Sequence, residues 1–173
     1  MILFSIENER VAWNMILEIE DKSKLPISLE IIQKSFATVA DEFHLTKENC
    51  PGHPTFMTLN KLQHSFESGK RMFLYCSGSK PVGFFSLKQF DSETWEMDHL
   101  AVLPKYRHRG IGRELLKFAE KTVKQQNGKT LKIGIIEKNE QLKQWYLQNG
   151  FVSTGTSHFE HLPVTVGFMM KDV

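Results

Sequence analysis

The strongest constraint on the fold is one short stretch in which a strand, a glycine-containing turn and a helix follow one another. The apolar run Leu100–Leu103 precedes Pro104, and Arg107–Gly112 (RHRGIG) leads into a segment with helical apolar spacing. Glycines at a helix entrance let the backbone turn tightly and leave N–H groups free, and the helix dipole attracts negative charge there. The pattern predicts a backbone site for an anion such as a pyrophosphate.

Other phosphate-binding patterns fit this stretch poorly. No Gly-Lys-Ser/Thr follows the glycines to hold a magnesium ion and a γ-phosphate, as a P-loop requires. The third glycine and distal acidic residue of a dinucleotide fingerprint are also missing. An ordinary tight strand–helix connection would show the same glycines, but the basic run Lys105–Arg109 favours the anion interpretation.

The first 70 residues carry mixed signals. Met1–Ile6 is predicted as a strand, whereas the apolar stretch Val11–Ile19 fits either a helix or a buried strand. A helix is expected from Ser28, whose hydroxyl could cap it. Leu59–Phe66 predicts a second, short helix that ends near Gly69.

The rest of the chain shows a clearer alternation of strands and helices. A hairpin is expected around Ser77–Lys80, and Gly128 stands where the helix after Gly112 would stop. The further elements predicted are strands at 94–102, 131–136, 151–159 and 164–170, and a helix at 139–149. The order is strand, two helices, three strands, helix, strand, helix and two strands, which predicts one mixed α/β domain over residues 1–173 with helices on both faces of the sheet.

Composition excludes several classes of protein. The chain has 173 residues, 40% hydrophobic, and a net charge of only +2, which argues against a general nucleic-acid or membrane-surface binder. Its two cysteines are too few for a disulfide framework and are expected to be reduced. Neither a signal peptide nor an apolar run long enough for a membrane span is present, so a cytoplasmic location is expected.

Two segments carry a resemblance to a known family. The run Leu100–Gly112, LAVLPKYRHRGIG, resembles the acetyl-CoA-binding motif of the GNAT acyltransferase superfamily, a strand, a proline-containing turn and Arg/Gln-x-x-Gly-x-Gly/Ala. Asn139–Phe151 is similar to the family's segment of Asn, helix and Tyr-x-x-x-Gly-Phe. The resemblance covers roughly residues 72–170. It implies a GNAT-like, largely antiparallel sheet of six to seven strands, with acetyl-CoA as co-substrate.

The resemblance also implies roles for individual residues. The backbone of Leu100, Ala101 and Val102 is expected to pair with the pantetheine arm as an added strand would. Asn139 is expected to contact the CoA arm, although it is also a good helix N-cap. The residues implied for the pyrophosphate are Arg107, His108, Arg109, Gly110, Ile111, Gly112 and Arg113.

Tyr146 is the implied proton donor to the departing sulfur. The resemblance places this tyrosine near the thioester, and a phenol can supply the proton that the leaving thiolate needs. A structural role is the alternative, because Tyr146 shares a helix face with Leu142 and Trp145.

The general base is expected on the strand before the motif. Glu96 lies eleven residues before Arg107, the position of a catalytic glutamate in some histone-acetylating GNATs. It could instead be an exposed strand carboxylate, and Asp98 and His99 are rivals. A bulge in this strand would turn His99 inward. The glutamate used on the next strand elsewhere in the superfamily is replaced here by Gly134.

Other histidines carry weaker signals. Cys50-x-x-His53 has metal-ligand spacing, but no second pair accompanies it, so a turn is expected and no metal is predicted. His158 and His161 bracket the final hairpin, where they would either line an acceptor site or lie in an ordinary loop.

Two functions follow from these features. The first is an N-acetyltransferase that moves acetyl from acetyl-CoA to a primary amine by direct attack in a ternary complex. The alternative is a non-catalytic CoA-binding module that senses CoA or regulates a partner. The expected partner is a small-molecule or peptide amine, with neither nucleic acid nor membrane; a homodimer is left open.

Overall fold

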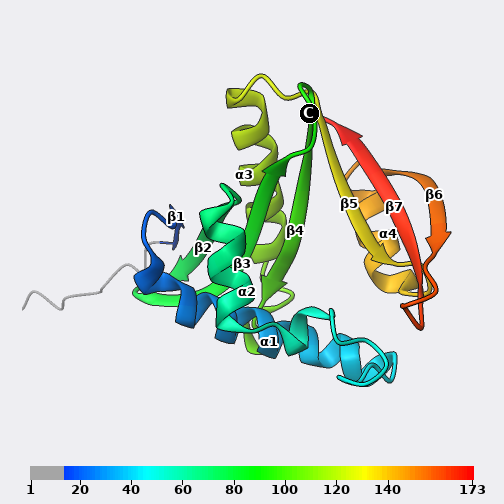
Figure 1. The fold of residues 1–173 in the computed structure, drawn as a ribbon. Coiled ribbons are helices and arrows are strands. Elements are labelled where there is room, and N and C mark those ends of the chain that lie inside the picture. Colours follow the sequence, from blue (N-terminus) through cyan, green and yellow to red (C-terminus); the bar gives the residue numbers. More distant parts are fainter. Residues whose placement is uncertain (1–13) are drawn as a thin grey trace, which may run out of the picture.

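The protein is built around one seven-stranded sheet that is open at one end (Figure 1). The computed structural model describes residues 14–173. The elements are β1 (Asn14–Glu18), α1 (Leu25–Glu42), α2 (Leu59–Glu67), β2 (Arg71–Ser77), β3 (Lys80–Gln89), β4 (Thr94–Val102), α3 (Ile111–Gln125), β5 (Thr130–Ile136), α4 (Glu140–Gln148), β6 (Val152–His158) and β7 (Thr165–Asp172), with short 3₁₀ turns at Lys22–Lys24, Pro54–Phe56 and Pro104–Tyr106.

The strand order in the sheet is β1-β2-β3-β4-β5-β7-β6. Only β4 and β5 are parallel, and they pair over three residues, from Thr94 opposite Thr130 to Glu96 opposite Lys132. Beyond that point the backbones of the two strands diverge in the shape of a V, and the space between these two arms of the sheet is called the opening here (Figure 1). The mixed, largely antiparallel sheet of seven strands confirms the predicted fold class.

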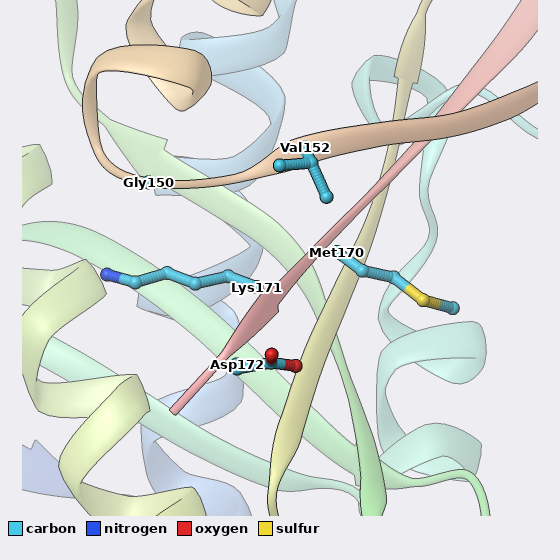
Figure 2. Close-up of a pocket in the computed structure, with 5 residues that line it drawn as sticks. All are labelled: Gly150, Val152, Met170, Lys171 and Asp172. Carbon is cyan, nitrogen blue, oxygen red and sulfur yellow. The ribbon is translucent and has the colours of Figure 1, made fainter.

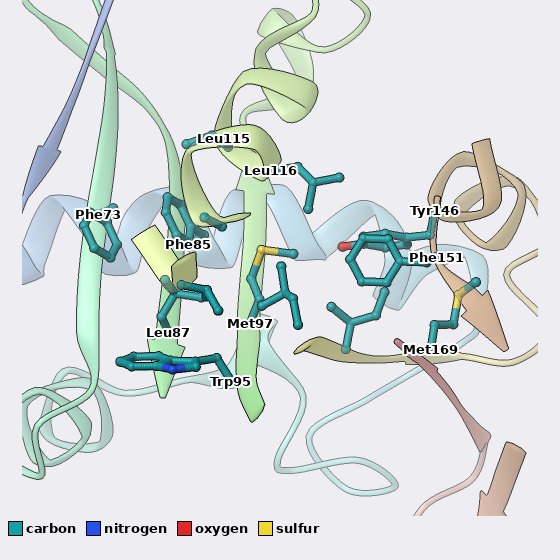
Figure 3. Close-up of a cluster of buried hydrophobic side chains, with 14 of the residues drawn as sticks. Phe73, Phe85, Leu87, Trp95, Met97, Leu115, Leu116, Tyr146, Phe151 and Met169 are labelled. Atoms are coloured by element: carbon teal, nitrogen blue, oxygen red, sulfur yellow. The ribbon is translucent and has the colours of Figure 1, made fainter. Parts of the chain in front are cut away.

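Two apolar clusters hold helices on opposite faces of the sheet. On one face, α3 and α4 bury Leu115, Ala119 and Tyr146 against Phe85 and Met97 (Figure 3). On the other face, residues of α1 and α2 pack against β2, β3 and Ala101 of β4. Burial of these side chains provides the main driving force for folding. The helices therefore lie on both faces, as the alternation of elements predicts.

The C-terminal end of α1 joins the two arms of the opening. Ala40 of α1 and Leu45 pack with Ile136 at the end of β5 and with Leu162 and Val164 before β7. In Figure 1 this end of α1 runs across the wide end of the V. The opening is thus bounded on one face by a helix that starts on the β2–β4 side of the sheet.

Two expectations for the N-terminal third are corrected or decided by the structure. Ser28 does not cap α1, which begins at Leu25; the hydroxyl donates instead to the Lys24 carbonyl at 2.8 Å. Pro26 allows the earlier start, because proline fixes φ and its missing N–H costs nothing in the first turn.

Within Val11–Ile19, the described part forms strand β1 rather than a helix. The strand expected at Met1–Ile6 lies outside the described residues.

The helix α3 ends just before Gly128, as predicted, and close packing explains why this residue is glycine. Asn127 takes the left-handed conformation (φ 59°), and the Gly128 N–H donates to the Val123 carbonyl at 2.9 Å. A Cβ on Gly128 would lie 2.5 Å from a Val123 methyl and 2.6 Å from the Trp95 ring. Glycine is therefore required by the close approach of β4 to the end of α3. None of the helices within residues 14–173 is long and apolar enough to cross a membrane.

Replacing Gly128 with alanine is expected to destabilise the fold. The added methyl must displace Val123 or the Trp95 ring, and overpacking of this kind costs about 1–3 kcal/mol. Urea unfolding followed by far-UV circular dichroism measures the loss. Gly52→Ala is the control, because a Cβ at Gly52 meets nothing within 4 Å. Equal stabilities of the two variants would contradict the close packing at Gly128.

Candidate functional site

The entrance of α3 presents a row of free backbone amides. His108 and Gly110 take left-handed conformations (φ 61° and 84°), and Gly110 is the N-cap of α3 without a side-chain cap. None of the six N–H groups from His108 to Arg113 donates a backbone hydrogen bond within the described residues. A Cβ at Gly110 would meet nothing within 4 Å. This open, amide-lined turn has the geometry that the sequence predicts for an anion site.

Arg107 lies in the motif, but its side chain points into the protein. The guanidinium donates to the Val102 carbonyl at 3.0 Å, to the Thr38 hydroxyl at 3.0 Å and to the Ser35 carbonyl at 2.6 Å. Burial lowers the pKa of Arg107 from its ordinary value. Arg107 therefore ties the end of β4 to α1, and only its backbone remains beside the free amides.

Charge near the amide row is arranged in favour of an anion. Glu114 is the only acidic residue in the first turn of α3. Its carboxylate accepts a hydrogen bond from the hydroxyl of Tyr75 in β2 at 2.8 Å, so it is engaged by the sheet. Burial and this hydrogen bond raise the pKa of Tyr75 to about 12. Arg109 and Lys80 both lie over the Tyr106 ring, at 5.4 Å and 5.7 Å from its centre. Positive side chains thus gather around the turn.

The strand segment Leu100–Val102 has one paired and one free edge. Ala101 and Val102 face Phe84 and Gly83 of β3, whereas β4 and β5 do not pair beyond Glu96. The Val102 carbonyl already accepts a hydrogen bond from Arg107. An extended ligand can supply partners for the other polar backbone groups along this edge, as an added strand would. The free edge runs directly into the turn that carries the free amides.

A β-bulge separates this segment from the start of β4. The register with β3 shifts between Phe84 and Ser86, and His99 has a φ of 55°. Met97 and Leu100 pack with the α3 cluster, so the bulge leaves both Asp98 and His99 on the α1 face. The bulge that the sequence left as an alternative is present, and it turns His99 inward.

Tyr146 lies in the core beneath the opening. It is 5% exposed and packs edge-on against Trp145 and Phe151. Burial raises the pKa of Tyr146, which keeps the phenol protonated at neutral pH. Its hydroxyl makes no hydrogen bond to the described residues, and Figure 3 shows it pointing from α4 towards β4. Tyr146 therefore packs in the core and keeps a protonated hydroxyl without a hydrogen-bond partner among the described residues.

Asn139 caps α4, as its position predicts. Its Oδ1 accepts a hydrogen bond from the Leu142 N–H at 3.0 Å, and the residue is 8% exposed. Trp145 from the same helix would lie 3.5 Å from a Cβ on Gly112. Asn139 thus starts α4, and Trp145 places this helix beside the entrance of α3.

Glu96 stands at the closed end of the opening. It is the last residue of β4 that pairs with β5, and its carboxylate lies 3.6 Å from the Lys132 ammonium. The Lys132 ammonium also lies 3.2 Å from the centre of the Phe90 ring. Glu96 is thus three residues away from the bulge and already has a cationic partner.

His99 directly precedes the segment Leu100–Val102 in β4. Its ring lies 6.2 Å from the Phe36 ring of α1, centre to centre. Burial lowers the pKa of His99 from 6.5 to about 4; Asp98 opposes this shift, and Lys70 and His53 reinforce it. The imidazole is therefore neutral at pH 7, and its unprotonated ring nitrogen can accept a hydrogen bond.

Cys50 and His53 do not form the start of a ligand set. Cys50 is buried in the apolar cluster at the end of α1, and His53 lies between the Phe36 and Phe56 rings. Within residues 14–173 no group of three metal-ligating side chains comes together. Gly134 faces the α1 side of the opening without a carboxylate, and His158 and His161 lie near the last hairpin.

One pocket lies outside the predicted site (Figure 2). It has a volume of about 230 Å³. Its walls are formed by Gly150, Val152, Met170, Lys171 and Asp172. None of the predicted site residues lines it, so it does not bear on the chemistry above.

A comparison with known protein families agrees with the two motifs that form the site. Residues 36–151, more than half of the chain, match the family described as Acetyltransferase (GNAT) family. The chain belongs to the GNAT acetyltransferase family. Both predicted motifs lie within the matched residues.

Solved structures of this family share the fold. Ribosomal-protein-S18-alanine N-acetyltransferase from Escherichia coli superposes with a TM-score of 0.73, at 16% identity over 93% of this chain and 94% of that chain. PaiA N-acetyltransferase from Thermoplasma acidophilum, solved with coenzyme A, has a TM-score of 0.71 at 21% identity over 93% and 99%. A GNAT family acetyltransferase from Elizabethkingia anophelis with acetyl-CoA bound has a TM-score of 0.67 at 17% identity over 92% and 98%.

Sequence reasoning missed two features of this site. The inward ties of Arg107 to α1 depend on residues about 70 positions away, for which the motif contains no signal. The packing of Phe36 and His53 beside His99 was equally hidden, because apolar spacing shows which face of a helix is buried but not which distant side chains it meets.

Burial of neutral His99 predicts a specific loss of stability in acid. The pKa of His99 is about 4 in the folded protein and 6.5 in the unfolded chain, so the unfolded chain binds a proton first as the pH falls. The free energy of unfolding therefore receives no penalty from His99 above pH 6.5 and decreases as the pH falls from 6.5 towards 4. The loss is roughly 2–3 kcal/mol of unfolding free energy. In urea unfolding at pH 4–7, the free energy of unfolding of His99→Gln should decrease less between pH 7 and pH 4 than that of the wild type. The exposed His64→Gln variant is the control; wild-type acid sensitivity in both would contradict a buried neutral His99.

Proposed function

We propose that the chain is an N-acetyltransferase that moves acetyl from acetyl-CoA to a primary amine by direct attack in a ternary complex. The observation that carries the proposal is the continuity of the free edge of β4 with the free amides from His108 to Arg113. A ligand with a pyrophosphate and an amide-containing arm fits both at once. The family and the relatives solved with acetyl-CoA or coenzyme A support this ligand.

Each part of the proposed site then has a defined task. The amides from His108 to Arg113 hold the pyrophosphate, and the backbone of Leu100–Val102 pairs with the pantetheine arm. Arg107 keeps these two segments in place through its bonds to Val102 and α1. Asn139 caps α4, the helix that carries Tyr146, and contacts the CoA arm.

Two proton transfers accompany the proposed reaction. The amine nitrogen forms a bond to the acetyl carbon, the carbon–sulfur bond breaks, and Tyr146 donates its proton to the departing sulfur. The amine gives up a proton to a base on the α1 face. We favour His99 over Glu96, because His99 lies beside the free edge, whereas Glu96 is at the closed end with Lys132.

Binding of acetyl-CoA should raise the melting temperature of the protein, because ligand binding stabilises the native state by mass action. Gly110→Val should abolish this shift, since the side chain projects where the pyrophosphate approaches. Gly69→Val is the matched control: Gly69 has a φ of 85° against 84° at Gly110, and neither Cβ would meet a neighbour. Both variants lose about 1–2 kcal/mol to left-handed strain. An unchanged melting curve of the wild type at millimolar acetyl-CoA would contradict the proposal.

Tyr146→Phe should lower kcat by about 10²–10⁴-fold, because only the proton donor is lost. Affinity for acetyl-CoA should stay nearly unchanged, since the packed ring remains. Release of free CoA with a panel of amines measures kcat, and the shift in melting temperature caused by acetyl-CoA measures binding.

In the CoA-release assay His99→Gln should reduce kcat more than Glu96→Gln, and the reverse order would assign the base to Glu96. Binding of acetyl-CoA without CoA release for any amine would instead favour a non-catalytic CoA-binding module.

A further inference from the structure

The α1 face beside the bulge carries an aromatic cluster that consists of Phe36, His53, Phe56 and His99. The Phe36 ring lies between two imidazoles, 5.9 Å from His53 and 6.2 Å from His99, in edge-on contacts. His53 contacts Phe56 at 6.2 Å. Phe36, Phe56 and His99 remain partly exposed, so their rings form a surface rather than a sealed core.

The aromatic cluster is held at the point where the proposed acetyl group lies. Arg107 ties the carbonyl of Ser35, next to Phe36, to the end of β4. Gln33 of α1 donates to the Met57 carbonyl at 2.9 Å and holds the His53–Phe56 turn against the helix. His99 directly precedes the free edge Leu100–Val102. An amine resting on this cluster would therefore stand next to the arm that carries the acetyl group.

Charges around the aromatic cluster are already balanced. The carboxylates of β4 on this face, Glu96 and Asp98, lie 3.6 Å from Lys132 and 2.5 Å from Lys70. Burial lowers the pKa of His53 as well as that of His99, so both rings are neutral at pH 7. Within the described residues, no carboxylate on this part of β4 is left to pair with a second ammonium group on an acceptor.

We infer that the acceptor, on the proposed acetyl-transfer function, is a monoamine whose primary amine is carried on an aromatic or apolar group. The apolar group lies against the partly exposed rings of Phe36 and Phe56, and the amine points to His99. Neutral, half-buried surroundings favour the uncharged amine, which is the nucleophilic form. A second ammonium on the acceptor would lose water without gaining a partner and would lie on the side of Lys70.

Two pairs of amines test this inference in CoA-release assays at saturating acetyl-CoA. Hexylamine and 1,6-diaminohexane differ only in the second ammonium, and hexylamine should have a kcat/KM about tenfold higher or more. 2-Phenylethylamine and ethylamine differ in the ring, and the former should be favoured by a similar factor of about ten. Preference for the diamine, or equal rates within both pairs, would overturn the inference.

Two variants, one on each face of the sheet, test whether the preference for an aromatic amine depends on the aromatic cluster. Phe36→Ala should lower kcat/KM about tenfold more for 2-phenylethylamine than for ethylamine. Phe118→Ala removes an equally half-buried ring from the α3 face and should affect both amines alike. Affinity for acetyl-CoA reports that each variant is folded, and Phe36→Leu replaces Phe36→Ala if the latter does not fold. Equal losses for both amines in the Phe36 variant would overturn the assignment.

The remaining outcomes separate the inference from the proposed function. Acetyl-CoA binding with turnover of diamines alone, of a peptide amino terminus at a far higher rate than 2-phenylethylamine, or of no amine in the panel would overturn the acceptor class. The first two results would leave acetyl transfer intact. Failure to bind acetyl-CoA would instead remove the proposed function itself.

Discussion

The parting of β4 from β5 is the constraint on which the rest of the structure depends. Parallel strands normally continue their ladder, because unpaired backbone groups inside a protein are costly. Here the ladder ends after Glu96 and Lys132, and the two arms are kept apart by what packs on them. The α3 and α4 helices fill one face, and the end of α1 spans the other. The backbone edge that results is polar, rigid and open.

The two faces of the opening divide the proposed chemistry between them. The α3–α4 face supplies the amides at a helix entrance and a buried, protonated phenol. The α1 face supplies an aromatic surface and a neutral imidazole. A single β-bulge separates the two roles, because it reverses the alternation of β4 and leaves Asp98 and His99 on one side. The thioester would lie between the two faces.

Arg107 shows how a motif residue can serve a ligand site without touching the ligand. Its three hydrogen bonds reach β4 and two residues of α1, so one cation joins the free edge, the amide turn and the helix that carries Phe36. Buried guanidinium groups are costly unless their donors are satisfied, and here the acceptors are protein oxygens. The free edge of β4 and the helix that carries Phe36 are thus linked through one side chain.

The sequence by itself determined the strand–turn–helix at 100–125, the order of elements after residue 72, and Asn139 as the cap of α4. These features depend on glycine conformation, hydrogen-bond capping and apolar periodicity, which act between near neighbours. Only the tertiary structure decided which way His99 faces, that Glu96 pairs with Lys132, and that Arg107 binds residues 69 and 72 positions away. Contacts between distant segments depend on strand register and helix packing, and a one-residue bulge is enough to change the face on which a side chain lies.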